Sequence, residues 1–120
     1  MEGLFPGETL TKINDGLSLI QNHAGLLFGT DALLLAAFVR RMPHAVAAEF
    51  GAGSGVVSLL LAGRGKLKKI YAVEVQDYYA VLTKRNAALN GLSDKVEAVA
   101  GDLRTFRTPC EAVFTNPPYR

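Results

Sequence analysis

Beyond Pro43, short apolar runs alternate with longer stretches of helical spacing, and this rhythm constrains the fold more than any other feature of the chain. The runs have the length and the β-branched content of buried strands. Such alternation is typical of a parallel sheet whose strands are joined by crossover helices. We therefore predict an α/β domain with strands at 46–50, 69–74, 96–100 and 112–115 and helices at 55–62 and 78–90.

The handedness of the crossovers predicts how the four strands are arranged. Right-handed connections place them in the spatial order 3-2-1-4, numbered along the chain. The first and fourth strands then flank the switch point of the sheet, where ligands bind outside the carboxyl ends of the strands. Candidate functional residues should therefore follow the ends of the strands.

The first 43 residues have a different pattern. Partly alternating runs at 10–13 and 17–21 are separated by the sequence Asn-Asp-Gly at 14–16, which suits a tight hairpin turn. Thr30 and Asp31 are good helix-capping residues, and the Leu- and Ala-rich stretch 32–42 predicts a mostly buried helix that ends before Pro43. We expect residues 1–43 to form an N-terminal hairpin and helix, and residues 44–120 to form the ligand-binding part.

Composition excludes several classes of protein. With 49% hydrophobic and 20% charged residues, the chain can bury a real core, and its net charge of +2 does not by itself indicate nucleic-acid binding. Cys110 has no partner for an internal disulfide, which favours a reducing compartment, so we expect a cytoplasmic protein. His23 and His44 are too isolated to form a metal site, and no run of about 20 apolar residues is available to span a membrane.

A glycine-rich segment, EFGAGSG at 49–55, follows the first predicted strand. Glycines permit a tight turn and allow a ligand to approach the backbone at the start of a helix, so we expect a cofactor loop. Val56 stands where a dinucleotide fingerprint would have its third glycine, and the Gly-Lys-Ser/Thr triplet of a P-loop is absent. These departures make it less probable that the loop binds a dinucleotide or a nucleoside triphosphate.

Carboxylates follow the second and third predicted strands. Glu74 is placed to accept hydrogen bonds from both hydroxyls of a ribose. Asp102 is placed to accept from an adenine amino group, with the Leu103 amide near a ring nitrogen. Two acids without a basic phosphate clamp favour a nucleoside cofactor that lacks a pyrophosphate. A nicotinamide cofactor remains an alternative because Glu74 also suits its ribose.

The fourth predicted strand leads into Asn116-Pro117-Pro118-Tyr119. The side-chain carbonyl of Asn116 and the main-chain carbonyl of Pro117 can accept the two hydrogens of a planar amino group, while the Tyr119 ring stacks behind it. Pro118 restricts the backbone that aims the second carbonyl. This arrangement favours attack by an amino nitrogen, and its alternatives are a rigid turn or a proline-rich ligand motif.

Taken in order, these motifs resemble those of class I S-adenosylmethionine-dependent methyltransferases, in the amino-methylating branch with an Asn-Pro-Pro-Tyr motif. Gln21 and the segment FGTDALL at 28–34 are similar to the bacterial family that methylates the adenine amino group beside the anticodon of a valine tRNA. The chain departs from that family at Leu27, where a basic residue is common, and in lacking the half that follows Asn-Pro-Pro-Tyr.

The resemblance implies S-adenosylmethionine as the cofactor, tRNA as the partner, and a Rossmann-like methyltransferase fold truncated after its fourth strand. The methionine end would lie on the glycine loop with its amino group near Glu49, and Thr30 and Asp31 would either close over its carboxylate or merely cap the helix. The implied cofactor-binding residues are Thr30, Asp31, Glu49, Gly51, Ala52, Gly53, Gly55, Glu74, Asp102 and Leu103. The implied catalytic residues are Asn116, Pro117 and Tyr119.

Several alternatives stay open at this point. The same acceptors suit a glutamine side-chain amide in a protein or the amino group of guanine in ribosomal RNA. Lys12, Lys84 and Arg85 are either phosphate contacts or solvated charges. Without the second half of the family fold, the fourth strand would have an exposed edge, so we expect a homodimer through it. The chain would then be a working enzyme or an inactive, self-associating, cofactor-binding fragment.

Overall fold

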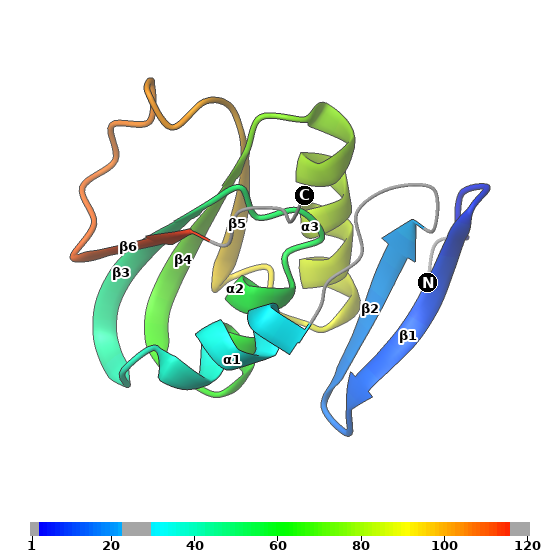
Figure 1. Cartoon of the computed structure of the whole chain (residues 1–120), viewed down its shortest axis with the longest axis horizontal. Helices are drawn as coiled ribbons and strands as arrows, with labels where there is room; N and C mark the ends of the chain where they lie inside the picture. The colour runs from blue at the N-terminus through cyan, green and yellow to red at the C-terminus, as the bar shows by residue number, and fades with distance from the viewer. Residues whose placement is uncertain (1–2, 23–29, 116–120) are drawn as a thin grey trace.

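The structure of the chain is a computed structural model that describes residues 3–22 and 30–115, with only the backbone described for residues 30 and 31. It contains an N-terminal hairpin and a parallel sheet flanked by helices (Figure 1). The elements, in chain order, are β1 (Glu8–Asn14), β2 (Leu17–Asn22), α1 (Thr30–Phe38), β3 (Met42–Phe50), α2 (Val56–Gly63), β4 (Leu67–Glu74), α3 (Asp77–Leu89), β5 (Val96–Ala100) and β6 (Ala112–Thr115).

The parallel sheet has the order β5-β4-β3-β6, which confirms the predicted order 3-2-1-4. Its two central strands are in register at Ala47 and Ile70, and Ala47 also pairs with Ala112 of β6. The ends of β5 and β6 were predicted correctly, because each is a compact apolar run bounded by polar residues. The predicted hairpin is also confirmed, with Leu10 of β1 opposite Ile20 of β2.

The two faces of this sheet are covered differently. Alternate residues of β4 point to opposite faces, and Ile70 and Ala72 pack in the main core with Leu59 of α2. On the other face, Tyr71 contacts Phe106, which lies in the connection between β5 and β6. That connection contains no helix, so an irregular segment covers this face, as the orange trace in Figure 1 shows.

Helix α1 differs from its prediction at its end. It stops at Phe38, and β3 already begins at Met42. Pro43 lies where the β3–β4 register shifts, a place where its missing N–H breaks no ladder bond. The carbonyls left free at the end of the helix are satisfied by Lys66, whose Nζ donates to Ala36, Ala37 and Val39 oxygens at 2.9, 3.2 and 3.0 Å.

The prediction that this helix is mostly buried was also wrong. Ala32 and Ala36 are buried, whereas Leu33, Leu34 and Phe38 are exposed, and Phe38 is 83% exposed. Only one face of α1 packs against the core, and an Ala- and Leu-rich sequence does not reveal which face that is. Within the described part of the chain, no helix has the length and apolar content needed to cross a bilayer.

The hairpin is part of the main body and not an appendage. Leu17 and Leu19 of β2 belong to the same core cluster as the residues of α2, while Ile20 packs against Tyr79 and Leu82 of α3. The hairpin is thereby held beside α3, the helix that follows the second strand of the sheet.

Candidate functional site

Three loops meet at the carboxyl edge of the sheet. Phe50 pairs with both Val73 and Thr115, and Glu74 pairs with Ala100, so the segments that follow β3, β4 and β5 leave the sheet side by side. The sequence predictions for Glu49 to Gly55, Glu74, Asp102 and Leu103 all fall on or directly beside these segments. The fold therefore brings the described members of the predicted site to one edge.

The glycine loop has a backbone that other residues adopt only with strain. Gly51, Gly53 and Gly55 have φ of +74°, +58° and +87°, in the left-handed region. The amides of Gly51 and Ala52 both donate to the carbonyl of Val73, at 2.8 and 3.3 Å. Gly55 immediately precedes α2, so the loop delivers the chain to the start of that helix.

Glu74 closes this loop from the neighbouring strand. It is 6% exposed, and its Oε1 accepts the N–H of Gly53 at 3.0 Å while its Oε2 accepts the N–H of Gln76 at 2.9 Å. Each carboxylate oxygen retains a further lone pair. Glu74 thus holds two loops together and can still accept hydrogen bonds from a ligand.

Two side chains of helix α3, those of Thr83 and Asn86, hold the glycine loop by hydrogen bonds, and neither was predicted from the sequence. The hydroxyl of Thr83 donates to the carbonyl of Gly53 at 2.8 Å, and the Nδ2 of Asn86 donates to the carbonyl of Ser54 at 2.9 Å. A Cβ on Gly55 would approach the Thr83 methyl group to 2.8 Å. The available signal was the spacing of Thr83, Asn86 and Asn90, which places polar side chains on one helical face.

Glu49, the next-to-last residue of β3, is 1% exposed. The hydroxyl of Ser58 in α2 donates to its Oε1 at 2.6 Å. Burial raises the pKa of Glu49 to about 7, the hydrogen bond from Ser58 opposes that rise, and the nearby Glu74 charge adds to it. A buried carboxyl group two residues before the glycine loop therefore changes its charge near neutral pH.

Asp102 is engaged by Arg104 in a forked ion pair. Arg104 Nη2 donates to Oδ2 at 2.7 Å, Nε contacts both oxygens at 3.1 Å, and the Arg104 amide donates to Oδ1 at 2.8 Å. These contacts, led by the Arg104 side chain, lower the pKa of Asp102 to about 2. Leu103 and Val75 are 59% and 66% exposed, so each of the two neighbouring loops presents an apolar side chain. The position of Val75 beside the candidate site was not predicted, because its exposure depends on the fold.

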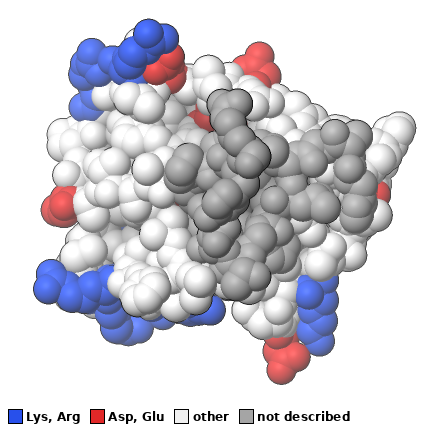
Figure 2. All heavy atoms as spheres, in the orientation of Figure 1, with Lys and Arg blue, Asp and Glu red and all other residues white. Residues whose placement is uncertain are grey.

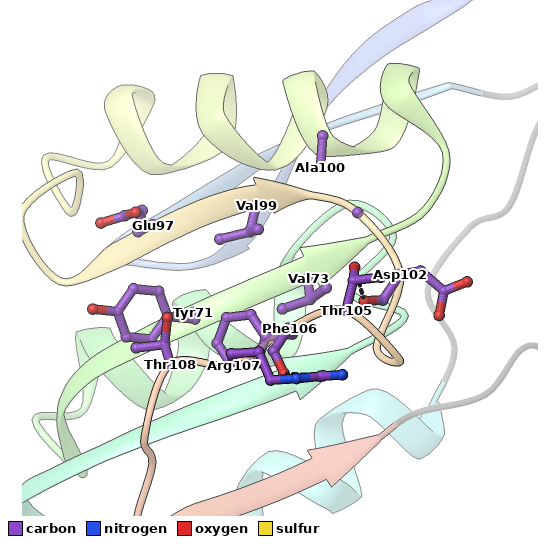
Figure 3. A pocket seen from close by; sticks show the side chains of 11 residues that line it. Tyr71, Val73, Glu97, Val99, Ala100, Asp102, Thr105, Phe106, Arg107 and Thr108 are labelled. Atoms are coloured by element: carbon purple, nitrogen blue, oxygen red, sulfur yellow. Dashed lines mark hydrogen bonds between the residues drawn. The ribbon is translucent and has the colours of Figure 1, made fainter.

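A pocket of about 310 Å³ adjoins Asp102 on the face of the sheet covered by the β5–β6 connection (Figure 3). Its central wall is the ring of Phe106, whose centroid lies 5.7 Å from those of both Phe50 and Tyr71. Figure 3 shows Asp102 and Thr105 at the end nearest the carboxyl ends of the strands, and Tyr71 and Thr108 at the opposite end, toward the starts of the strands. The lining is Tyr71, Val73, Glu97, Val99, Ala100, Gly101, Asp102, Thr105, Phe106, Arg107 and Thr108.

Part of the predicted site lies outside the described residues. This applies to Asn116, Pro117 and Tyr119, and to the side chains of Thr30 and Asp31. The backbone of α1 begins at Thr30, as its capping sequence predicted. Strand β6 is described to Thr115, whose hydroxyl donates to the carbonyl of Phe50 at 3.0 Å, directly before the glycine loop.

The candidate phosphate contacts have different surroundings. Arg85 donates to both oxygens of Glu8, at 2.7 and 2.8 Å, and lies 4.1 Å from the centroid of the Phe5 ring, so its charge is committed to the hairpin. Lys12 pairs with Asp15 at 3.2 Å on the surface, and Lys84 is exposed. Figure 2 shows the basic side chains in separate groups around the rim of the face seen in that view.

Comparison with known proteins yields a consistent set of relatives. The model of the TRM5/TYW2 methyltransferase domain family matches residues 36–116. The tRNA1(Val) (adenine(37)-N6)-methyltransferase of Aeromonas hydrophila is 30% identical over 113 residues, which cover 88% of this chain and 48% of that protein. This chain therefore spans about half the length of the curated relatives it matches.

Two solved structures share the fold. The tRNA m1G37 methyltransferase of M. jannaschii superimposes with a TM-score of 0.77 at 25% identity, over 98% of this chain and 37% of the other. TYW2 of P. horikoshii, solved in complex with MeSAdo, superimposes with a TM-score of 0.71 at 25% identity, over 84% of this chain and 38% of the other. Both confirm the predicted Rossmann-like methyltransferase architecture.

Proposed function

This chain belongs to the TRM5/TYW2 methyltransferase domain family, and from that premise we propose that it binds S-adenosylmethionine for methyl transfer to an amino group of tRNA. The observation that carries the proposal is the convergence of the glycine loop, Glu74 and Asp102 at one edge of the sheet. The bound cofactor would supply an electrophilic methyl group on a positively charged sulfur. Carboxylates beside a glycine loop suit such a cation better than they suit a pyrophosphate.

The described residues fit this cofactor in chemistry as well as in position. We assign the glycine loop and Glu49 to its methionine end, Glu74 to its ribose, and Asp102 with Leu103 to its adenine. Support comes from the spare lone pairs on Glu74 and from the exposed apolar side chains of Val75 and Leu103, which suit the faces of a flat base. A similar protein was solved in complex with MeSAdo, which supports a cofactor of the S-adenosylmethionine class.

We assign the transfer step to Asn116, Pro117 and Tyr119. The lone pair of an aromatic amine is delocalised into its ring, so the amine becomes nucleophilic when two acceptors draw on its hydrogens. The carbonyls of Asn116 and Pro117 supply those acceptors, and Tyr119 stacks on a base that has left its own stack. The position of Thr115 beside Phe50 supports this assignment, because consecutive Cα atoms are only about 3.8 Å apart.

For the substrate, we propose the N6 amino group of adenine in tRNA. The Aeromonas relative is named for that atom, and the two acceptors require a nitrogen with two hydrogens, which a ring nitrogen such as N1 of guanine does not have. A guanine amino group of ribosomal RNA and a protein glutamine amide meet the same requirement, so they are the alternatives. A tRNA substrate also agrees with the cytoplasmic location expected from Cys110.

The first experiment is isothermal titration of the chain with S-adenosylmethionine and S-adenosylhomocysteine. We expect binding that Asp102→Ala weakens at least tenfold, an effect of about 1.4 kcal/mol. Asp15→Ala is the control, because Asp15 is an exposed carboxylate that pairs with Lys12 in the hairpin and does not line the pocket. Absence of binding by the folded wild-type chain would contradict the proposal.

The second experiment tests transfer and substrate. The chain is incubated with labelled cofactor and unmodified tRNA, ribosomal RNA or protein, and the products are identified by mass spectrometry. N6-methyladenosine in tRNA is the expected product, and Asn116→Ala should abolish it. Cofactor binding without transfer to any of the three would favour the cofactor-binding fragment over the working enzyme.

We also propose that the free edge of β6 mediates self-association. Among the described strands, β6 pairs only with β3, and its Val113 is 60% exposed. Unpaired backbone groups and an exposed apolar side chain favour pairing with a second strand. Light scattering at micromolar concentrations should show a dimer that Val113→Lys dissociates, and a monomeric wild-type chain would refute the dimer.

A further inference from the structure

Asn86 joins two parts of the molecule that are distant in sequence. Its side chain is fully buried, at 0% exposure. Its Oδ1 accepts the N–H of Ile20 at 2.7 Å, and its Nδ2 donates to the carbonyls of Ile20 at 3.1 Å and of Ser54 at 2.9 Å. The side chain thus pairs with the backbone of β2 as a neighbouring strand would, and its remaining donor reaches the glycine loop.

Asn90 provides a natural comparison one turn farther along α3. Its Oδ1 accepts the N–H of Ser18 at 2.9 Å, and its Nδ2 donates to the carbonyl of Ser18 at 2.7 Å. Its Nδ2 also donates to the main-chain carbonyl of Asn86, one turn earlier in the helix, at 2.8 Å. The two asparagines therefore hold the same strand by the same pairing, and the contact to the glycine loop distinguishes Asn86.

The carbonyl of Ser54 occupies a sensitive place in the loop. Ser54 is 7% exposed, and it directly precedes Gly55, whose φ of +87° turns the chain into α2. A buried carbonyl that loses its hydrogen-bond donor raises the free energy of the folded state, so the loop would move until this carbonyl finds another donor. Because Asn86 is itself fixed by Ile20, the seating of β2 determines where this donor lies.

We propose that Asn86 is a positioning residue that couples the docking of the N-terminal hairpin to the shape of the cofactor-binding glycine loop. The functional part of this inference rests on the proposed function of that loop. Strand β2 then acts as a brace for the cofactor site, and loosening the hairpin at Ile20 weakens cofactor binding although Ile20 is not among the residues assigned to the cofactor.

The test compares Asn86→Ala with Asn90→Ala by amide hydrogen exchange without ligand. Both variants should accelerate exchange in β2. Only Asn86→Ala should accelerate exchange at Gly53 and Gly55, by about tenfold or more for the loss of one buried hydrogen bond. Equal acceleration at these glycines in the two variants, or none in Asn86→Ala, would overturn the coupling.

Titration with S-adenosylhomocysteine gives the functional readout. Affinity should fall about tenfold in Asn86→Ala and stay within about twofold in Asn90→Ala, as expected for one buried hydrogen bond. Failure of the wild-type chain to bind S-adenosylhomocysteine would count against the proposed function. The hydrogen-exchange comparison tests the coupling separately, because it uses no ligand.

Asn86→Asp keeps the test decisive if the alanine variant does not fold. The shape and the acceptor for the Ile20 amide are retained, but an ionised carboxylate offers no donor to Ser54. At pH 8, affinity should fall about tenfold relative to wild type, whereas Asn90→Asp should stay within about twofold. Equal affinities of the two aspartate variants would contradict the role of the Nδ2 donor.

Discussion

The N–H of Gly53 donates to the carboxylate of Glu74 at 3.0 Å, so the strand that ends in Glu74 holds the loop that follows its neighbour. The other carboxylate oxygen accepts the N–H of Gln76 at 2.9 Å. One side chain therefore fixes two of the three loops of the site before any ligand arrives. Such fixation reduces the ordering that a ligand must otherwise impose.

Glu74→Gln should loosen both loops. The amide retains a single acceptor oxygen and turns an N–H₂ group toward a backbone donor. We expect a loss of about 2 kcal/mol in the free energy of unfolding, measured by urea denaturation, and weaker cofactor binding. Glu97→Gln, at an exposed ion pair, should change stability by less than about 1 kcal/mol. Equal unfolding curves for Glu74→Gln and wild type would refute the bracing role.

Glu49→Gln should stabilise the protein in a pH-dependent way. The pKa of Glu49 is raised from 4.5 to about 7 in the folded chain, so this group reduces stability as the pH rises through that interval. Glutamine cannot ionise, yet it still accepts the Ser58 hydrogen bond. We expect a gain of about 3 kcal/mol at pH 8 and little change at pH 4, measured by urea denaturation. A variant no more stable than wild type at pH 8 would contradict the buried charge.

Acid should release the hairpin through Glu8. The hydrogen bond from Arg85 is the main cause that lowers the pKa of Glu8 from 4.5 to about 2. The resulting stabilisation is fully present above pH 4.5 and is lost as the pH falls toward 2. Glu8→Gln should cost about 3 kcal/mol at pH 7 and little at pH 2. Lys12→Ala, which breaks an exposed ion pair, is the control and should lose much less stability than Glu8→Gln. Equal losses of stability in the two variants would contradict the role of the pair between Glu8 and Arg85.

Gly55→Ala should be more harmful than Gly91→Ala. Both glycines have positive φ, of +87° and +68°, but a Cβ on Gly55 would meet the Thr83 methyl group at 2.8 Å, whereas a Cβ on Gly91 would find no atom within 4 Å. We expect losses of about 3 and about 1 kcal/mol in thermal or urea unfolding. Adding Thr83→Ser should recover part of the larger loss. Equal losses at the two glycines would show that the contact with Thr83 is unimportant.

Arg104→Ala should strengthen cofactor binding. Arg104 now donates to both oxygens of Asp102, the carboxylate assigned to the adenine amino group. Removing this exposed competitor should raise affinity by up to about fivefold, as judged from exposed ion pairs. Arg64→Ala, at an exposed position that does not line the pocket, should have no such effect in the same titration. Weaker binding by Arg104→Ala would instead mean that the guanidinium contacts the ligand.

Local sequence patterns predicted the sheet well because each strand can be recognised from its own residues. The apolar run 96–100 and the turn sequence at 14–16 each identify their element without help from distant residues. The end of α1 could not be read in the same way. It depends on Lys66, which caps helical carbonyls 27 to 30 residues earlier in the chain.

The residues of the candidate site at the strand ends could be predicted from the sequence, but their hydrogen-bond and ion-pair partners could not. Glu74 and Asp102 follow strands, and the order of the strands alone brings them to one edge. Their present partners, Gly53 and Arg104, depend on loop geometry that no periodicity encodes. Arg85 was open to interpretation as a phosphate contact because Glu8, its partner, lies 77 residues away in sequence.

The attachment of β2 to α3 has a consequence for synthesis. Ile20 and Asn86 are separated by 66 positions, so the hairpin is synthesised several seconds before its support, at roughly 5–20 residues per second. A two-stranded hairpin is marginal on its own in water. The newly made hairpin must therefore remain unsupported until α3 is synthesised, and a nascent chain stalled before α3 should be cleaved in the hairpin by protease far more readily than the finished protein.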